Sequence, residues 1–205
     1  MSFSTGSLEQ PLQALASPKP TPGGGTAAAV AGAMGVSLLV MAAGLARTRG
    51  NTEDERGTLA AMRASLEPLA ASLQACADRD AEAFGQVMAA YRMPKAADDE
   101  KTRRKVAIQA ALRTATDVPL ETLRLAAKAL ELGETVARHG NPAAASDIGV
   151  AACLLRAAAD GAAANVRANL GGLADEGYRS SVTVEVDQLV TRADEARARL
   201  LAALA

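Results

Sequence analysis

The residues best suited to chemistry in this 205-residue sequence are polar side chains set on otherwise apolar helical stripes. Asp80 lies between Cys76 and Ala83 on the stripe of a predicted long helix. A carboxylate that faces a core is costly unless it is paired or used. The pattern therefore predicts that Asp80 is either a ligand-facing group or the buried partner of an arginine.

A second stripe begins in a carboxylate and ends in two amides. It belongs to a helix predicted from Ser146 or Asp147 to about Leu170, and its last members are Asn165 and Asn169. Asp147 is either an acid–base group or an acid favoured in the first helical turn by the helix dipole. The two amides either contact a ligand or bridge helices through hydrogen bonds. Together with Asp80 they indicate a polar pocket, but they do not name its substrate.

Three consecutive glycines, Gly23, Gly24 and Gly25, precede Thr26 at the predicted start of a helix. Backbone N–H groups of such a turn can face an anionic or polar ligand, helped by the helix dipole. The alternative is a tight entry turn with Thr26 as the N-cap. The turn is not a P-loop, because no Gly-Lys-Ser/Thr follows and no predicted strand precedes it.

The uncharged run 27–46 behind the glycine turn is long enough to cross a bilayer. It consists mostly of Ala and Gly, which contribute little transfer energy, and nothing else in the chain resembles a span. We therefore expect no membrane insertion and interpret the run as the centre of a bundle. Its small-residue stripe would let other helices approach closely: Ala28, Gly32, Gly35 and Leu39.

Abundant Ala and few β-branched or aromatic residues favour helix throughout. The sequence predicts one all-α domain, residues 1–205, in which long helices pack through Ala/Gly-rich faces around a central apolar helix. The expected helices also include a short one ending before Pro18, Glu55–Arg92 (one helix or two joined near Pro68), one from about Asp98 ending before Pro119, Leu120–Arg138, and Ser181–Leu204. Gly140 after His139 is expected to supply a left-handed cap.

Charge and cysteine usage exclude several classes of function. The net charge is −1 and aromatic residues make up 2% of the chain, so we expect no nucleic-acid partner. Cys76 and Cys153 have no neighbouring Cys or His, so we expect no metal site, and two buried thiols suit a reducing cytosol. We see no signal peptide.

Basic residues near the middle of the chain have ordinary explanations. Lys95 follows Met93-Pro94, and such a lysine is usually a solvated charge. Arg103, Arg104 and Lys105 are typical of an exposed helix face.

The same polar residues fall in an ordered set of motifs that resembles the cyclodeaminase/cyclohydrolase family of folate one-carbon enzymes. The set covers most of the chain in the family's order. The matching stretches are PTPGGGTAAA at 20–29, DAEAF at 80–84, YRMPK at 91–95, IQAAL at 108–112, TDVPL at 116–120, GN at 140–141, SDIGV at 146–150 and NVRANL at 165–170.

The resemblance implies an all-helical homodimer that acts on a tetrahydrofolate derivative in the cytoplasm and needs no further cofactor. The chain looks like the free-standing kind, so the first expectation is a methenyltetrahydrofolate cyclohydrolase (a hydrolase). The alternatives are a formimidoyltetrahydrofolate cyclodeaminase (a lyase) and a folate-binding or scaffold protein without turnover. Two tracts depart from the family pattern: Pro11 and Gln13 replace an aromatic residue and an acid, and Arg47–Asn51 replaces a basic tract.

Roles for single residues follow from the resemblance as hypotheses. Asp147 would be the carboxylate beside the substrate's amidinium cation or the base, with Asp80 as the second acid–base group or an orienting group. The glycine turn would form a wall of the folate pocket. The remaining assignments are Gln109, Asn165 and Asn169 at the pterin edge, and Lys95 or Arg49 at the folate carboxylates.

Overall fold

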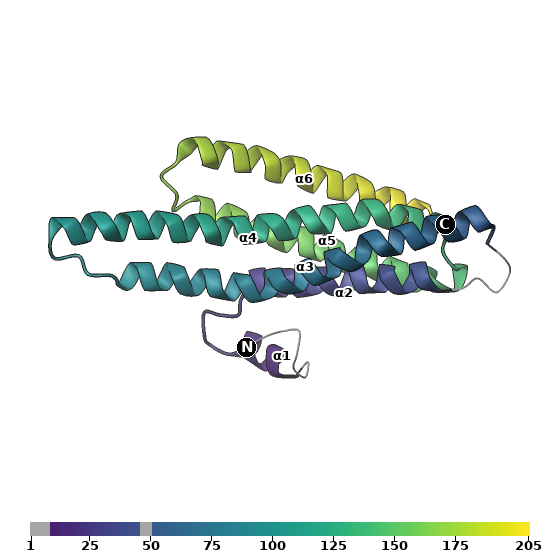
Figure 1. The fold of residues 1–205 in the computed structure, drawn as a ribbon, viewed down its shortest axis with the longest axis horizontal. Coiled ribbons are helices and arrows are strands. Elements are labelled where there is room, and N and C mark those ends of the chain that lie inside the picture. Colours follow the sequence, from purple (N-terminus) through teal and green to yellow (C-terminus); the bar gives the residue numbers. More distant parts are fainter. Residues whose placement is uncertain (1–8, 46–50) are drawn as a thin grey trace.

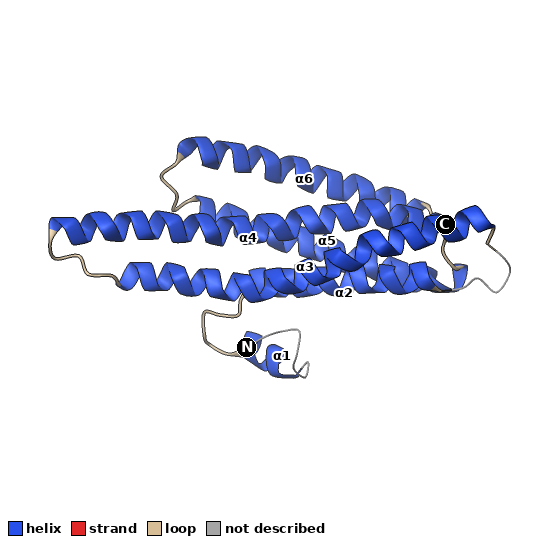
Figure 2. Ribbon diagram, viewed as in Figure 1, coloured by secondary structure: helices blue, strands red, loops and turns tan. Residues whose placement is uncertain are grey.

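The structure, a computed structural model, describes residues 9–45 and 51–205, and within those ranges it contains helices and no strand (Figures 1 and 2). The predicted all-α bundle is confirmed. The elements are α1 (Glu9–Ala16), α2 (Gly24–Gly44), α3 (Glu53–Arg92), α4 (Asp98–His139), the 3-10 helix η1 (Pro142–Ala144), α5 (Ala145–Leu170) and α6 (Glu176–Ala202).

Helix α2 is packed mainly against α3 and α5, as the predicted central helix should be. A Cβ at Gly32 would lie 3.1 Å from Leu73 of α3 and 3.2 Å from Ala158 of α5. A Cβ at Gly35 would lie 2.8 Å from Leu155 of α5. The small-residue stripe therefore does allow the close approach that we predicted.

Two prolines lie inside helices without ending them. Helix α3 runs continuously through Pro68, so the single-helix alternative is correct. Helix α4 runs through Pro119, so the predicted break before that residue is wrong. Proline removes the hydrogen bond to the carbonyl four residues earlier, here that of Ala115. The side chain of Asn169 donates to this carbonyl at 2.7 Å, which supplies the missing donor.

Three helix ends differ from the sequence expectations. Thr26 is not an N-cap, because α2 begins at Gly24 with Gly23 as its cap residue. Helix α4 ends at His139 as predicted, but Gly140 has a φ of −67° and not a left-handed conformation. Gly140 suits this position because a Cβ there would clash with the carbonyl of Val136. Helix α6 begins at Glu176, earlier than expected, because Asp175 accepts from the N–H of Tyr178 at 2.9 Å.

Two helical segments, Gly24–Gly44 and Pro142–Leu170, are long and apolar enough to cross a membrane, whereas the sequence analysis singled out only the first. Half of the first segment's most apolar window and 39% of the second's are buried inside the bundle. The two helices also pack against each other. Their apolar character is therefore used at least in part for packing within the chain.

Helix α1 lies beside the bundle, joined to α2 by residues 17–23, and makes few contacts with the other helices (Figure 1). At the same end of the molecule, the hairpin of α3 and α4 projects past the start of α2 (Figure 1). The start of α2 is thus flanked by α1 on one side and by the hairpin on the other.

Candidate functional site

The start of α2 meets the middle of α3 at a buried pair formed by Thr26 and Asp80. The hydroxyl of Thr26 donates to Oδ2 of Asp80 at 2.8 Å, and Thr26 is fully buried. The backbone N–H of Thr26 also donates to this carboxylate. No arginine pairs with Asp80 within the described ranges, so the arginine alternative of the sequence analysis does not apply.

Gly25 is required at this contact for a steric reason. A Cβ at Gly25 would clash with the carboxylate of Asp80, whose Cγ would be only 2.7 Å away. The glycine turn therefore lets the first turn of α2 approach the Asp80 carboxylate closely. The positive end of the helix dipole faces that negative charge.

The surroundings of Asp80 move its protonation toward neutral pH. Burial raises the pKa of the Asp80 carboxyl, and the two hydrogen bonds from Thr26 offset only part of that rise. A carboxyl with a raised pKa exchanges protons more readily near neutral pH than an ordinary aspartate does. The geometry thus provides an acid–base group next to the glycine turn.

Asn165 of α5 completes this cluster from the other side of α2. Its Nδ2 would lie 3.5 Å from a Cβ at Gly24 and donates to the carbonyl of Gly161 at 2.8 Å. Its Oδ1 accepts no hydrogen bond from the part of the chain that the structure describes. The structure therefore brings together four of the features named from the sequence: the glycine turn, Thr26, Asp80 and Asn165.

Two other amides are engaged with the protein backbone. Asn169 donates to Ala115, as described above, so the helix-bridging alternative is confirmed for this residue. Gln109 donates to the carbonyl of Gly172 at 3.0 Å and accepts from the N–H of Ala174 at 2.7 Å. It thereby fixes the turn between α5 and α6, a role that the sequence analysis missed. Contact of either amide with a pterin stays a prediction.

Asp147 lies at the opposite end of α5 from Asn165. The two residues are separated by 18 positions, which corresponds to about 27 Å along a helix. Since Asn165 adjoins the glycine turn, a single chain does not bring Asp147 to the Asp80 carboxylate. Asp147 is partly exposed near the junction with η1.

The tract that departs from the family pattern near the N-terminus lines a cleft beside this cluster. The cleft has a volume of about 540 Å³ and is bounded by Gln13 of α1, by Thr21 and Pro22 before the glycine turn, and by Ala81, the neighbour of Asp80. Pro11 is buried. Arg49, and all of the Arg47–Asn51 tract except Asn51, lie outside the described residues.

Lys95 is exposed and lies in a separate hollow of about 310 Å³ on the α3–α4 hairpin. Gln109 also lines this hollow, together with Lys101, Arg104, Lys105 and Ile108. Across residues 9–45 and 51–205, no three His, Cys, Asp or Glu side chains converge as metal ligands would. Cys76 is buried as expected, but Cys153 is exposed.

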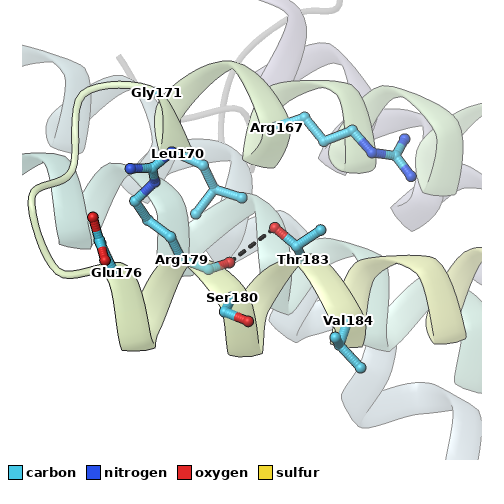
Figure 3. A pocket seen from close by; sticks show the side chains of 8 residues that line it. All are labelled: Arg167, Leu170, Gly171, Glu176, Arg179, Ser180, Thr183 and Val184. Atoms are coloured by element: carbon cyan, nitrogen blue, oxygen red, sulfur yellow. Dashed lines mark hydrogen bonds between the residues drawn. The ribbon is translucent and has the colours of Figure 1, made fainter.

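A larger hollow of about 610 Å³ lies between the end of α5 and the start of α6 (Figure 3). Arg167 and Arg179 border it, with Leu170 and Val184 supplying apolar surface. Arg167 is already ion-paired with Asp187 at 2.8 Å. None of the carboxylates, glycines or amides named from the sequence lines this hollow, so it is not the candidate site.

Comparison with known proteins agrees with these motifs. Residues 7–188 match the family model described as formiminotransferase-cyclodeaminase. A methenyltetrahydrofolate cyclohydrolase of Methylorubrum extorquens is 39% identical over 193 residues, which cover 94% of this chain and 93% of that protein. A formimidoyltransferase-cyclodeaminase of Gallus gallus is 33% identical over 196 residues, which cover 94% of this chain but only 36% of that protein.

The fold also has a solved counterpart. The crystal structure of a formiminotetrahydrofolate cyclodeaminase from Thermotoga maritima superimposes with a TM-score of 0.86 at 30% sequence identity. The superposition covers 98% of this chain and 96% of that one. The similarity therefore extends over the whole helical bundle.

Proposed function

We propose that this chain, which belongs to the formiminotransferase-cyclodeaminase family, is a methenyltetrahydrofolate cyclohydrolase that opens its substrate to 10-formyltetrahydrofolate. The observation that carries the proposal is the buried Asp80 carboxylate, held by Thr26 at the glycine turn. This acid–base group belongs to a chain that is similar to a cyclohydrolase along nearly the whole length of both.

The chemistry of the reaction requires what this cluster contains. Methenyltetrahydrofolate carries a delocalised amidinium cation between N5 and N10. Hydrolysis needs a water directed at the bridging carbon, a base that takes its proton, and an acid that protonates N5 as the ring opens. A carboxylate beside the cation stabilises it electrostatically. Asp80 would supply such a carboxylate, and its raised pKa suits it to accept a proton and then return it.

A role for Asp147 in the same reaction requires a second copy of the chain. In one chain about 27 Å of helix α5 separates Asp147 from Asn165. If two copies of α5 pair antiparallel about residue 156, the midpoint, Asp147 of one copy comes beside Asn165 of the other. We propose such a homodimer, in which each site combines Asp80 of one subunit with Asp147 of the partner subunit.

Exposed apolar side chains support this pairing. On α2, Met34 is 50% exposed and Met41 is 40% exposed. On α5, Val150 is 52% exposed and Cys153 is also exposed. A second copy would cover apolar surface on the two helices that carry the candidate site. The proposal places this dimer in the cytoplasm.

The second candidate function is cyclodeamination, favoured by the structural similarity to the Thermotoga maritima enzyme. In that reaction N10 attacks the formimino carbon and ammonia leaves, so the same reacting centre is used. The third candidate is a folate-binding protein without turnover, since Gln13 replaces an acid of the family pattern beside the cleft.

One experiment with two substrates separates the three. The loss of methenyltetrahydrofolate absorbance is followed near neutral pH and compared with the spontaneous rate, and ammonia release from formiminotetrahydrofolate is measured in parallel. Acceleration of the first reaction alone supports the cyclohydrolase. Ammonia release would replace it by the cyclodeaminase, and binding of folate without either reaction would leave the scaffold.

A further inference from the structure

The hollow on the α3–α4 hairpin is lined by four cationic side chains and by no acid. Lys95 comes from the connection after α3, and Lys101, Arg104 and Lys105 come from the first turns of α4. Ile108 and Gln109 complete a space of about 310 Å³. Concave surfaces lined by one sign of charge concentrate ligands of the opposite sign.

The charges in this hollow are mostly not neutralised by the protein. Lys101 pairs with Asp98 at 2.8 Å, but Lys95 and Lys105 have no ion pair among the described residues. Arg104 is held in place, since it donates to the carbonyl of Tyr91 at 3.0 Å and lies 5.7 Å from the centroid of that ring. The hollow therefore keeps at least two uncompensated cations next to one that is fixed.

Arg104 and Lys105 are not simply a solvated helix face, as the sequence alone indicated. Arg103, one position earlier, does behave that way: it pairs with Asp99 on the same helix and does not line the hollow. The difference comes from α3, whose last turn provides Tyr91 and folds the Lys95 segment over α4.

The hollow is positioned beyond the candidate site in the direction in which the hairpin projects (Figure 1). Gln109 joins the two, because it lines the hollow and hydrogen-bonds to Gly172, which is seven positions after Asn165. Seven positions correspond to about 10 Å along a helix, and Lys105 lies about one turn, roughly 6 Å, from Gln109. A folate carries its pteridine, an aminobenzoyl ring and its glutamate in a row, so a substrate with its ring at Asp80 would extend toward these cations.

We propose that this cationic hollow binds the γ-linked glutamates that extend the tail of a folate, so that the protein prefers polyglutamylated substrates. The inference rests on the proposed folate reaction and adds a site for the tail. Each added glutamate brings one more carboxylate, and four cations around one hollow suit an oligo-carboxylate better than the single tail of a monoglutamate.

The test compares the binding of tetrahydrofolate monoglutamate and triglutamate by calorimetry at low ionic strength. We expect the triglutamate to bind more tightly, with an advantage that shrinks as sodium chloride is added. Lys105→Gln should reduce the ratio of the two affinities about two- to fivefold, the scale of one exposed charge pair. Arg103→Gln is the matched control on the same helix and should leave that ratio unchanged.

The possible outcomes separate this inference from the function on which it rests. Turnover of the monoglutamate without any preference for the triglutamate would overturn the tail site and leave the proposed function intact. The absence of folate binding and turnover would overturn both. The tail site would also be wrong if inorganic phosphate displaced the triglutamate far better than chloride at equal ionic strength, since the hollow would then be a phosphate site.

Discussion

The side-chain amide of Asn169 donates to the main-chain carbonyl of Ala115 at 2.7 Å, across the contact between α5 and α4. This carbonyl would otherwise lack a donor, because Pro119 stands where its helical partner should be. One asparagine thus keeps α4 continuous from Asp98 to His139. It also anchors the end of α5 that carries Asn165, beside the glycine turn.

The pairing of Asn169 with the proline-free carbonyl can be tested by a double-mutant cycle. We expect Asn169→Ala to lower the free energy of unfolding by about 1–3 kcal/mol, the cost of a lost hydrogen bond to a buried carbonyl. In a Pro119→Ala background the backbone N–H is available again, so the same change should cost less by about 1 kcal/mol. Urea denaturation of the four proteins gives both values. Equal costs in the two backgrounds would mean that Asn169 acts through another contact.

The assignment of the two carboxylates predicts a large loss of turnover. We expect Asp80→Asn and Asp147→Asn each to lower the rate of methenyltetrahydrofolate hydrolysis at least about a hundredfold, the usual scale for losing acid–base help. Stopped-flow absorbance checks this, with circular dichroism as the control for folding. Near-normal turnover of either variant would remove that residue from the mechanism.

The shared site predicts complementation between these two inactive variants. When Asp80→Asn and Asp147→Asn subunits are mixed and allowed to exchange, half of the dimers are mixed. Each mixed dimer contains one site with both aspartates, so about a quarter of the wild-type activity should return. Activity that stays at the level of the separate variants, in a mixture shown to exchange, would argue against a site shared between subunits.

The raised pKa of Asp80 predicts a specific pH dependence of stability. The folded state holds the Asp80 proton more tightly than the unfolded state does. The stabilisation from this group is therefore complete below the unfolded-state pKa of about 4 and is lost as pH rises through the higher folded-state pKa. The wild type should lose stability relative to Asp80→Asn between about pH 4 and pH 7. Denaturation series of both proteins measure this difference, and an opposite slope would mean that hydrogen bonds from Thr26 dominate over burial.

Two glycines of α2 should respond differently to enlargement. Gly32→Val places side-chain atoms against Leu73 and Ala158, and we expect about 1–3 kcal/mol of destabilisation from overpacking. Gly24 is exposed and has only Asn165 nearby, so Gly24→Val should weaken folate binding while changing stability less. Thermal melts and folate titrations of the two variants give the comparison. Unfolding of both would show that the glycine turn serves the fold alone.

The sequence by itself determined the helical class, the small-residue packing of α2 and the family. These features depend on local properties: helix propensity, the spacing of apolar residues, and short motifs in order. The start of α6 was placed too late because its capping contact, between Asp175 and Tyr178, was not recognised as a signal. The same local signals correctly marked Asp80 and Asn165 as polar side chains on inward stripes.

Only the tertiary structure decided which of these polar residues meet. Thr26 and Asp80 are 54 positions apart, as are Asn169 and Ala115, so no local pattern could show that they bond. The first contact makes a capping candidate part of the site, and the second lets a helix pass through a proline. Asp147 and Asn165 show the reverse: they share one stripe of one helix, yet the length of that helix keeps them apart. The hydrogen bonds and separations that define the site are set by packing between helices, which sequence periodicity does not encode.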